Sequence, residues 1–534
     1  MNYGDVVFDP LKDKGIISDK DRIKERFPDK DLVITKKFLD ARHGKLKLCY
    51  RVEDFDPSMQ DLKIRSMEKE AMPYLNELDE ESKSRYPSPV IIGFGPAGMF
   101  AALILARYGF DPIVIERGRK VDDRIRDCED YRRGIRGLDI NSNILFGEGG
   151  AGTFSDGKLY TGIGSGLIGF VNRTFYRHGA PYEICYSSHP HIGTDNLRKI
   201  VSSIRSEIEA LGGKILFDTE FTGLKMNNGQ IGSVVCMSKE GEIEIPACGV
   251  ILGIGHSATD TMRKLYADGI AMESKSFSVG VRIEHLRRNI DIARYGVDSA
   301  ELYNIGAADY KLAVDTASGR KLYTFCMCPG GEVVASSAFP GHIVTNGMSY
   351  HARDFDNSNS ALLVPVTMED FGEGVFDGLK FRELLETKAF ELAGSNDNAP
   401  CMTYGDLASG KVTEHNDPAL IPSYKPGVTN CDLRELFPQF ITDTLIDGIR
   451  LMGKKIKGFD SPDAVLTAPE TGSSSPVRIL RDKETFMSIS CRGLFPAGEG
   501  AGYAGGIVSS AVDGINCANA YVRSVGLKVY NYKS

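Results

Sequence analysis

Residues 90–118 read VIIGFGPAGMFAALILARYGFDPIVIERG, and this stretch decides the fold. An apolar run at 90–95 leads into a glycine turn, a helix-length apolar segment follows, and a second apolar run ends at Glu116. Strand, turn, helix and strand in this order predict a parallel βαβ unit. The uncharged residues 87–106 approach the length of about 20 that spans a bilayer. Their glycines and prolines argue against one continuous helix, so we expect a buried strand, turn and helix.

The pattern G-x-G-x-x-G occurs four times, at 93–98, 147–152, 164–169 and 500–505. Only the first copy follows an apolar strand, opens an apolar helix and precedes a second strand that ends in an acid, Glu116. This context is typical of dinucleotide-binding βαβ units. The alternative is a glycine turn that serves packing alone and binds no ligand.

Each part of the motif has a role in dinucleotide binding. Gly93 allows a sharp turn, Gly95 lets the backbone approach a pyrophosphate, and Gly98 lets the helix pack closely with its N-terminal N–H groups facing the phosphates. Glu116 would accept hydrogen bonds from the adenosine ribose. An acid here favours FAD or NAD over NADP, although the neighbouring Arg117 weakens that preference.

Two further glycine-rich segments favour FAD over NAD. The polar loop GEGGAGTFSDGK at 147–158 could wrap around a long dinucleotide. Near the C-terminus, Gly498, Glu499 and Gly500 end a strand, and a helix begins near 505–507. The N-terminus of such a helix can place N–H donors at the flavin edge where negative charge accumulates on reduction, a partner that nicotinamide does not need.

The composition excludes several classes of protein. The chain has 534 residues, of which 42% are hydrophobic and 25% charged, as in multidomain soluble proteins. Its 64 Lys+Arg and 72 Asp+Glu give a net charge of −8, so there is no overall basic field for nucleic acid or anionic lipid. The 11 cysteines lack metal-ligand spacing and the N-terminus lacks a secretion signal. We expect a reduced, cytoplasmic protein without a metal site.

The predicted fold is α/β with a divided central domain. Residues 1–86 are highly charged, with a helix expected at 19–27 and strands at 32–39 and 45–52, and a linker is expected at 73–89. Residues 214–256 contain three β-rich runs separated by Asn-Gly and Glu-Gly turns, which predict a β-meander. The chain therefore divides into a small N-terminal α+β domain (1–86), the first part of a FAD/NAD(P)-binding Rossmann-like domain (87–270), an inserted α+β cap or substrate domain (271–485) and the C-terminal part of the FAD-binding domain (486–534).

The chain resembles a known family along nearly its whole length. Residues 90–118, GVILGIGHSA at 249–258 and GLFPAGEGAGYAGGI at 493–507 resemble flavoproteins with the glutathione-reductase-type FAD fold. More specific strings look like those of the uncharacterised FAD-dependent dehydrogenases, also called NAD(FAD)-utilising dehydrogenases: LDAR (39–42), GEGGAGTFSDGKL (147–159), FCMCPGG (325–331), TNGMSYHARD (345–354) and SSPVRI (474–479). The resemblance implies a bound FAD and a cap domain over the flavin, but no defined substrate.

The resemblance also implies which residues bind the cofactor. The pyrophosphate would lie at Gly93, Gly95, Pro96, Ala97 and Gly98, with the adenosine ribose at Glu116 and Arg117. The flavin side would be flanked by Gly150, Gly152, Thr153, Ser155, Asp156, Gly157 and Lys158. Glu499 would meet the ribityl or pyrophosphate end. The remaining expected contacts are Gly255, His256 in a structural role near the adenosine half, Gly498, Gly505, Gly506 and Ile507.

Several chemistries lack their usual residues. No C-x4-C pair, as in disulfide reductases of this fold, lies between Glu116 and Leu159, and no histidine in the 147–159 loop could attach flavin covalently, so we expect non-covalent FAD. A second complete nucleotide-binding βαβ unit is also missing from the sequence. NAD(P)H would therefore visit the flavin transiently as a co-substrate or not be used.

The candidate catalytic residues are Lys158, Cys326 and Cys328. A cation at Lys158, with Asp156 beside it, would influence the charge of a reduced flavin. Cys326 and Cys328 alternate on a predicted strand, so both would point to one face as a redox dithiol, unless they are simply packing thiols. Residues of the inserted region that could line a substrate pocket, or merely be solvated, are His285, Tyr350, His351 and Arg353.

Two functions from different classes follow. The favoured one is a FAD-dependent oxidoreductase, a dehydrogenase or reductase that passes a hydride or electron pair between a small organic substrate and a second donor or acceptor, with NAD(P)H as a candidate. The alternative is a flavin-binding regulatory or redox-sensing protein whose N-terminal module engages a protein or RNA partner. The oligomeric state, the substrate and the reaction direction cannot be read from the sequence.

Overall fold

The computed structural model describes residues 2–11, 18–40, 46–54, 88–302, 305–413, 420–527 and 529. Most of the predicted linker at 73–89 and half of the LDAR string at 39–42 lie outside these ranges. None of the helices in the described ranges combines the length and apolar character that a membrane crossing requires.

A five-stranded parallel sheet forms the centre of the molecule. Its strand order is β22 (Leu494–Pro496), β10 (Val250–Leu252), β4 (Val90–Ile92), β5 (Ile113–Ile115) and β6 (Lys214–Leu216). Helix α4 (Pro96–Arg107) connects β4 to β5, which pair in parallel, so the predicted βαβ unit is confirmed. The predicted C-terminal return is also confirmed, because β22 joins this sheet and leads into α15 (Ile507–Ser524).

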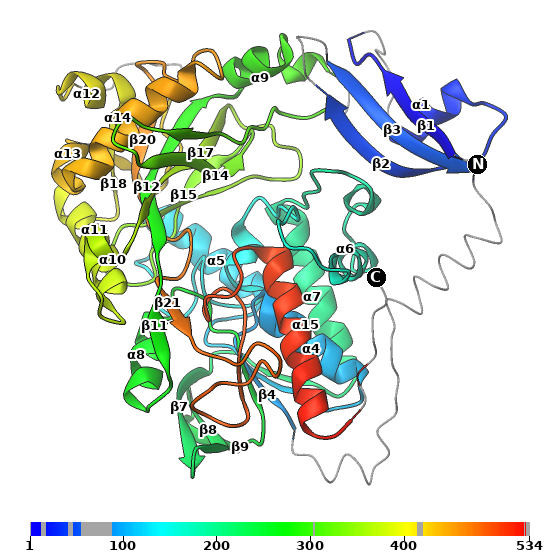
Figure 1. The fold of residues 1–534 in the computed structure, drawn as a ribbon, viewed down its shortest axis with the longest axis vertical. Coiled ribbons are helices and arrows are strands. Elements are labelled where there is room, and N and C mark those ends of the chain that lie inside the picture. The colour runs from blue at the N-terminus through cyan, green and yellow to red at the C-terminus, as the bar shows by residue number, and fades with distance from the viewer. Residues whose placement is uncertain are drawn as a thin grey trace.

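The two faces of this sheet are buried against different elements. Ile91, Val114 and Ile251 face one apolar core, which also contains α4, α7 (Thr194–Ala210) and α15. Figure 1 shows α15 in red beside α4 and α7. The approach of α15 to α4 requires a glycine, since a Cβ on Gly514 would lie 2.0 Å from the Ala97 carbonyl oxygen.

The opposite face of the sheet packs against the predicted β-meander. Strands β7 (Glu220–Asn227), β8 (Gln230–Ser238) and β9 (Gly241–Pro246) form an antiparallel sheet, which confirms the meander. The apolar run at 214–226, expected as one strand, is divided between two sheets. Asp218, with φ of +51°, turns the chain between β6 and β7.

A second, seven-stranded sheet forms the core of the region between β10 and β22. Its order is β13 (Ala313–Asp315), β14 (Lys321–Cys328), β17 (Asn357–Val366), β12 (Phe277–Leu286), β20 (Val465–Glu470), β18 (Ala399–Thr403) and β19 (Val428–Asn430). Helices α11 (Asp377–Leu392) and α14 (Gln439–Gly453) contribute to its apolar core. The hairpin of β15 (Glu332–Ala335) and β16 (Thr345–Met348) packs against β12, β14, β17 and β20. We call residues 276–473 the cap.

The chain enters and leaves the cap through neighbouring strands. β11 (Met272–Ser274) and β21 (Val477–Ile479) form an antiparallel pair, so both connections run next to each other. The division of the chain at residues 86, 270 and 485 remains a prediction.

Further α-helices of the described residues between β4 and β22 are α5 (Val121–Arg132), α6 (Leu167–Arg177), α8 (Thr259–Ala267), α9 (Arg287–Tyr295), α10 (Met368–Phe371), α12 (Tyr404–Ser409) and α13 (Leu433–Leu436).

The N-terminal residues form a three-stranded antiparallel sheet of β1 (Asn2–Phe8), β3 (Lys47–Asp54) and β2 (Leu32–Asp40), with α1 (Asp19–Arg26) packed on it. Figure 1 shows this module in blue at the upper right. Lys37 on β2 joins it to the rest of the protein. The Lys37 N–H donates to the Tyr186 carbonyl, its carbonyl accepts from the Ser188 N–H, and its ammonium lies 2.7 Å from a Glu183 carboxylate oxygen.

Candidate cofactor site

A cavity of about 750 Å³ lies between the parallel sheet and the cap. Four of its lining residues directly follow strand ends: Gly93 after β4, Glu116 after β5, Gly253 after β10 and Ala497 after β22. The cavity therefore lies at the carboxyl edge of the sheet. Open parallel sheets bind their ligands at this edge.

The three glycines at 93–98 have different surroundings. Gly93 has φ of +92°, and a Cβ there would lie 2.4 Å from the Gly253 carbonyl oxygen. A Cβ on Gly98 would lie 1.9 Å from the Gly93 carbonyl oxygen, so Gly98 packs α4 against the turn and does not itself line the cavity. Gly95 lines the cavity and has open space before it, the nearest atom to its Cβ position being Gly150 Cα at 3.8 Å.

Glu116 holds the turn and the neighbouring loop together. Its Oε2 accepts from the Phe94 N–H at 2.7 Å, and its Oε1 accepts from the Gly118 N–H at 3.0 Å and the Gly147 N–H at 2.9 Å. A carboxylate oxygen can accept two hydrogen bonds. Oε2 therefore keeps one lone pair with which Glu116, a lining residue, could accept from a ribose hydroxyl.

Arg117 also lines the cavity, but acids already engage its guanidinium. Its Nη2 lies 3.2 Å from Glu220 and 3.1 Å from Asp260, and its guanidinium stacks 4.4 Å from the centre of the Phe146 ring. These neighbours satisfy the positive charge that would bind a 2′-phosphate. The surroundings of Arg117 thus support a cofactor with a free ribose 2′-hydroxyl.

The 147–158 loop approaches the glycine turn closely. A Cβ on Gly150 would lie 2.9 Å from Gly95 Cα. The loop residues that line the cavity are Gly150, Ala151, Gly152, Ser155, Asp156, Gly157 and Lys158. Thr153 does not line it, contrary to expectation, because its hydroxyl points into the protein and donates to the Glu148 carbonyl.

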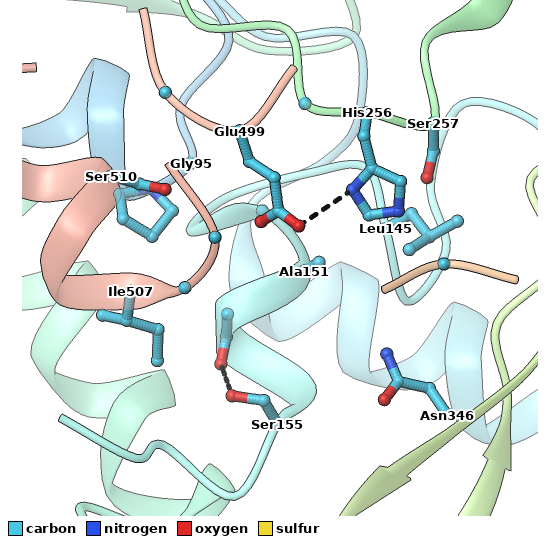
Figure 2. Close-up of a pocket in the computed structure, with 18 of the residues that line it drawn as sticks. Gly95, Leu145, Ala151, Ser155, His256, Ser257, Asn346, Glu499, Ile507 and Ser510 are labelled. Atoms are coloured by element: carbon cyan, nitrogen blue, oxygen red, sulfur yellow. Dashed lines mark hydrogen bonds and ion pairs between the residues drawn. The ribbon is translucent and has the colours of Figure 1, made fainter. Parts of the chain in front are cut away.

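Residues near the C-terminus continue the cavity wall beside the loop and the glycine turn. Gly498, Glu499, Gly505, Gly506 and Ile507 all line the cavity, and α15 begins there with its N-terminus. Gly255 and His256 lie beside them. Figure 2 shows the side chains of Glu499 and His256 pointing toward each other, with Oε1 and Nδ1 3.5 Å apart.

Burial governs the charge of this pair. Burial raises the pKa of Glu499 to about 7. Burial, together with the nearby Arg382 and Lys275, lowers the pKa of His256 to about 3. His256 is therefore neutral at pH 7, and Glu499 titrates close to neutrality.

An ion pair connects the loop to the cap. Arg353 Nη2 lies 2.7 Å from Asp156 Oδ2, and Asp156 also accepts from the Ser349 hydroxyl. Burial raises the pKa of Asp156, but Arg353 and Lys158 lower it more, and its net pKa lies well below the usual value. Asp156 is thus a carboxylate held between two cations at the cavity wall.

The cysteine pair differs from its expected geometry. Along β14, Phe325 pairs with Ala361 and Cys328 with Asn359, so one extra residue forms a bulge that interrupts the alternation of side chains. Cys326, with φ of +41°, lines the cavity, whereas Cys328 is fully buried behind it and donates to the Cys326 carbonyl at 3.3 Å. Only Cys326 faces the cavity.

The other polar candidates in the cap divide similarly. Arg353 lines the cavity. His285 instead hydrogen-bonds the Phe459 carbonyl, His351 stacks on His191, and Tyr350 lies outside the cavity lining. Lining residues that the sequence did not single out include Asp309, Lys311, Asn346 and Glu470. They come from separate strands and loops of the cap. Asn346 lies within the string TNGMSYHARD quoted above, but nothing in that string singled out its amide.

The residues around the cavity fit a dinucleotide. The open space before Gly95, the remaining lone pair of Glu116 and the N-termini of α4 and α15 provide a backbone approach, a ribose acceptor and two positive helix ends. Within the described ranges, no group of three His, Cys, Asp or Glu side chains is arranged to hold a metal ion.

Comparisons with known proteins agree with this assignment. Residues 276–473 match the family described as "FAD-dependent protein, C-terminal domain-like". An "Uncharacterized protein" of Clostridium beijerinckii is 42% identical over 506 residues, which cover 93% of each chain.

Solved structures share the fold only distantly. A geranylgeranyl bacteriochlorophyll reductase-like protein from Thermoplasma acidophilum is 11% identical, with 82% of this chain and 78% of that one covered and a TM-score of 0.36. A glycerol-3-phosphate dehydrogenase from Bacillus halodurans complexed with FAD is 12% identical, with 84% and 66% covered and a TM-score of 0.36. Likeness this low adds nothing to what the topology itself shows. The relative at 42% identity shows the family: the chain belongs to one family with the Clostridium beijerinckii protein, and its residues 276–473 match the C-terminal domain-like family of FAD-dependent proteins.

Proposed function

We propose that this protein is a FAD-dependent oxidoreductase that binds one FAD non-covalently in the cavity and transfers a hydride or electron pair between a small organic substrate and a second donor or acceptor. One observation carries the proposal. The glycine turn at 93–98, Glu116 and the C-terminal residues 498–507 surround a single cavity, in a chain with the C-terminal domain of FAD-dependent proteins.

The two ends of the cavity would hold different parts of FAD. Gly95 and the N-terminus of α4 would bind the pyrophosphate, and Glu116 the adenosine ribose. The flavin would lie toward the cap, between the 150–158 loop, the start of α15 and the wall that contains Cys326. Glu499 would accept from the ribityl or pyrophosphate end.

Bound FAD supplies the reversible uptake of a hydride or two electrons. Around it, Lys158 places an ammonium at the cavity wall, where positive charge stabilises a developing anion. The neighbouring Cys328 thiol, Arg282 and Lys158 lower the pKa of the Cys326 thiol more than burial raises it, so this pKa lies well below its usual value. Cys326, the member of the pair that lines the cavity, is therefore the candidate thiolate.

Two classes of molecule are candidates for the second donor or acceptor: a nicotinamide dinucleotide and another redox partner. Residues 164–169, the glycine motif considered above as the start of a second nucleotide-binding unit, form a loop and the start of α6. They follow no strand of the parallel sheet. NAD(P)H would therefore reach the flavin transiently, through the cap side of the cavity, and the protein would work in the cytoplasm on small molecules.

The visible spectrum of the purified protein tests the proposal. We expect flavin absorption, FAD released by heating, and loss of the absorption with substrate or with NADH or NADPH under anaerobic conditions. A colourless protein that FAD cannot reconstitute would refute it. A yellow protein that no donor reduces, and that purifies with a macromolecule, would instead favour the redox-sensing alternative.

A further inference from the structure

A buried arginine organises the cap wall of the cavity. Arg282, on β12, is fully buried and reaches four acceptors on other strands. Its Nε donates to Glu470 Oε2 at 2.8 Å, Nη1 to the Cys326 carbonyl at 2.8 Å and to Asn359 Oδ1 at 3.0 Å, and Nη2 to Asn346 Oδ1 at 2.9 Å. Three of these four residues, Glu470, Cys326 and Asn346, line the cavity.

This network fixes which way the Asn346 amide faces. Asn346 Oδ1 accepts from Arg282 at 2.9 Å and also from the Gly347 N–H at 2.8 Å. A carbonyl oxygen has two lone pairs, and both are used. The reverse orientation would place the amide NH2 group against two donors, so the amide cannot flip.

The Nδ2 group of Asn346 consequently faces the cavity as a hydrogen-bond donor. Figure 2 shows the amide extending from β16 into the cavity. In the part of the chain that the structure describes, no protein acceptor takes its hydrogens. The neighbouring acceptor, Glu470 Oε2, is held by the same guanidinium. A preorganised donor of this kind is suited to an oxygen acceptor on a ligand.

We propose that Asn346 donates a hydrogen bond from Nδ2 to a carbonyl oxygen of the ligand in the cavity, and that Arg282 is the positioning residue that holds the amide in this orientation. Two ligands present such an oxygen, the pyrimidine carbonyls of the flavin and a carbonyl or carboxylate of the substrate. The inference rests on the proposed function only for the identity of this ligand.

The isosteric substitution Asn346→Asp isolates the donor. It keeps an oxygen for Arg282 and replaces the NH2 group by an acceptor. Asn359→Asp is the matched control, because Asn359 also accepts from Arg282 but is fully buried outside the cavity lining. Both variants place a carboxylate on the same guanidinium, and only Asn346→Asp changes what the ligand meets. Asn346→Ala removes the donor without adding charge, should the aspartate variant not fold.

Two measurements distinguish the sources of the carbonyl. The first is FAD affinity and the visible flavin spectrum. The second is calorimetric binding of benzamide, a neutral carbonyl probe, to the protein as purified, with benzylamine as the control that lacks a carbonyl. If the flavin supplies the oxygen, Asn346→Asp weakens FAD binding by about tenfold or more relative to Asn359→Asp and shifts the flavin absorption. If the substrate supplies it, FAD binding matches the control and benzamide binding weakens by a similar factor.

The inference is overturned if Asn346→Asp and Asn346→Ala equal Asn359→Asp in both measurements. Arg282→Lys should shift the spectrum or the benzamide affinity in the same direction as Asn346→Asp, because a lysine cannot hold the amide and Glu470 together. Wild-type protein that binds no flavin would refute the proposed function, and the benzamide measurement would then decide the role of Asn346 alone.

Discussion

Alanine at Gly98 and at Gly95 should separate the packing of the glycine turn from its contact with the cofactor. A Cβ on Gly98 would lie 1.9 Å from the Gly93 carbonyl oxygen, which is 1.1 Å shorter than 3.0 Å, the shortest distance that Cβ atoms ordinarily keep from other heavy atoms. The obstacle is backbone, so a rotamer change cannot relieve it. Glycine to alanine in a helix ordinarily stabilises by about 1 kcal/mol, whereas overpacking costs about 1–3 kcal/mol and a backbone clash lies at the upper end. We expect Gly98→Ala to destabilise the protein by about 2 kcal/mol.

Gly95→Ala should leave the fold intact. Gly95 has φ of −76°, which alanine adopts freely, and its nearest neighbour would be 3.8 Å away. The new methyl group enters the cavity where the backbone would meet the pyrophosphate, so FAD affinity should fall by at least about tenfold.

The assay compares flavin-free proteins by thermal unfolding and then titrates each with FAD. Gly98→Ala should melt a few degrees below wild type, and Gly95→Ala should melt with wild type but bind FAD weakly. Gly98→Ala melting at or above wild type would refute the packing argument. Gly95→Ala binding FAD like wild type would refute the placement of the pyrophosphate.

Three further predictions concern charged groups. Asp156→Asn and Arg353→Met should each lower the melting temperature more than their combination, since each alone removes the partner that lies 2.7 Å from a buried charge. Removing one partner of a buried pair costs about 3–5 kcal/mol, and the second cation, Lys158, places Arg353→Met at the lower end of this range; additive losses would contradict the pairing. Flavin-free Glu499→Gln should be more stable than wild type at pH 8, by up to roughly 3 kcal/mol for a folded-state pKa of about 7. The gain should shrink toward pH 5, because a raised carboxyl pKa destabilises the folded protein only as the pH rises above the pKa of the unfolded state. A gain that does not change with pH would argue against a titrating Glu499. Lys37→Met removes the ammonium that pairs with Glu183 and should therefore loosen the contact between the two segments. Hydrogen exchange at the Ser188 N–H, which donates to the Lys37 carbonyl, should become faster than in the exposed control Lys36→Met; equal exchange would show that the Lys37 side chain does not secure this segment.

The parts of the site that were predictable from the sequence are those whose chemistry lies within one short segment. The turn from Gly93 to Gly98 and the acid at Glu116 belong to one βαβ unit, so their spacing in the sequence is enough to predict their relative positions. The start of α15 was accessible for the same reason. Thr153 shows the limit of this reasoning, because its loop was recognised correctly while its hydroxyl turned inward to Glu148.

The cap wall was not predictable because it is assembled from distant strands. The orientation of the Asn346 amide depends on Arg282, which comes from another strand, and no pattern near either residue indicates the contact. Cys326 and Cys328 illustrate a different failure, since strand periodicity places both on one face but the bulge separates them. Polar residues such as His285 could not be divided into pocket-lining and buried ones without the tertiary packing.

The position of β22 and α15 has a consequence for how the molecule is made. The central sheet holds β4, β5, β6 and β10 from the early part of the chain, yet its edge strand β22 and the wall from Gly498 to Ile507 are synthesised only after the whole cap. Domains tend to fold in the order in which they emerge from the ribosome. The cap, an uninterrupted segment with its own apolar core, can therefore fold while the earlier half of the central domain still waits for its last strand. A chain interrupted between residue 473 and Leu494 would contain a complete cap and the glycine turn but only part of the cavity wall, so the cavity is complete only at the end of translation.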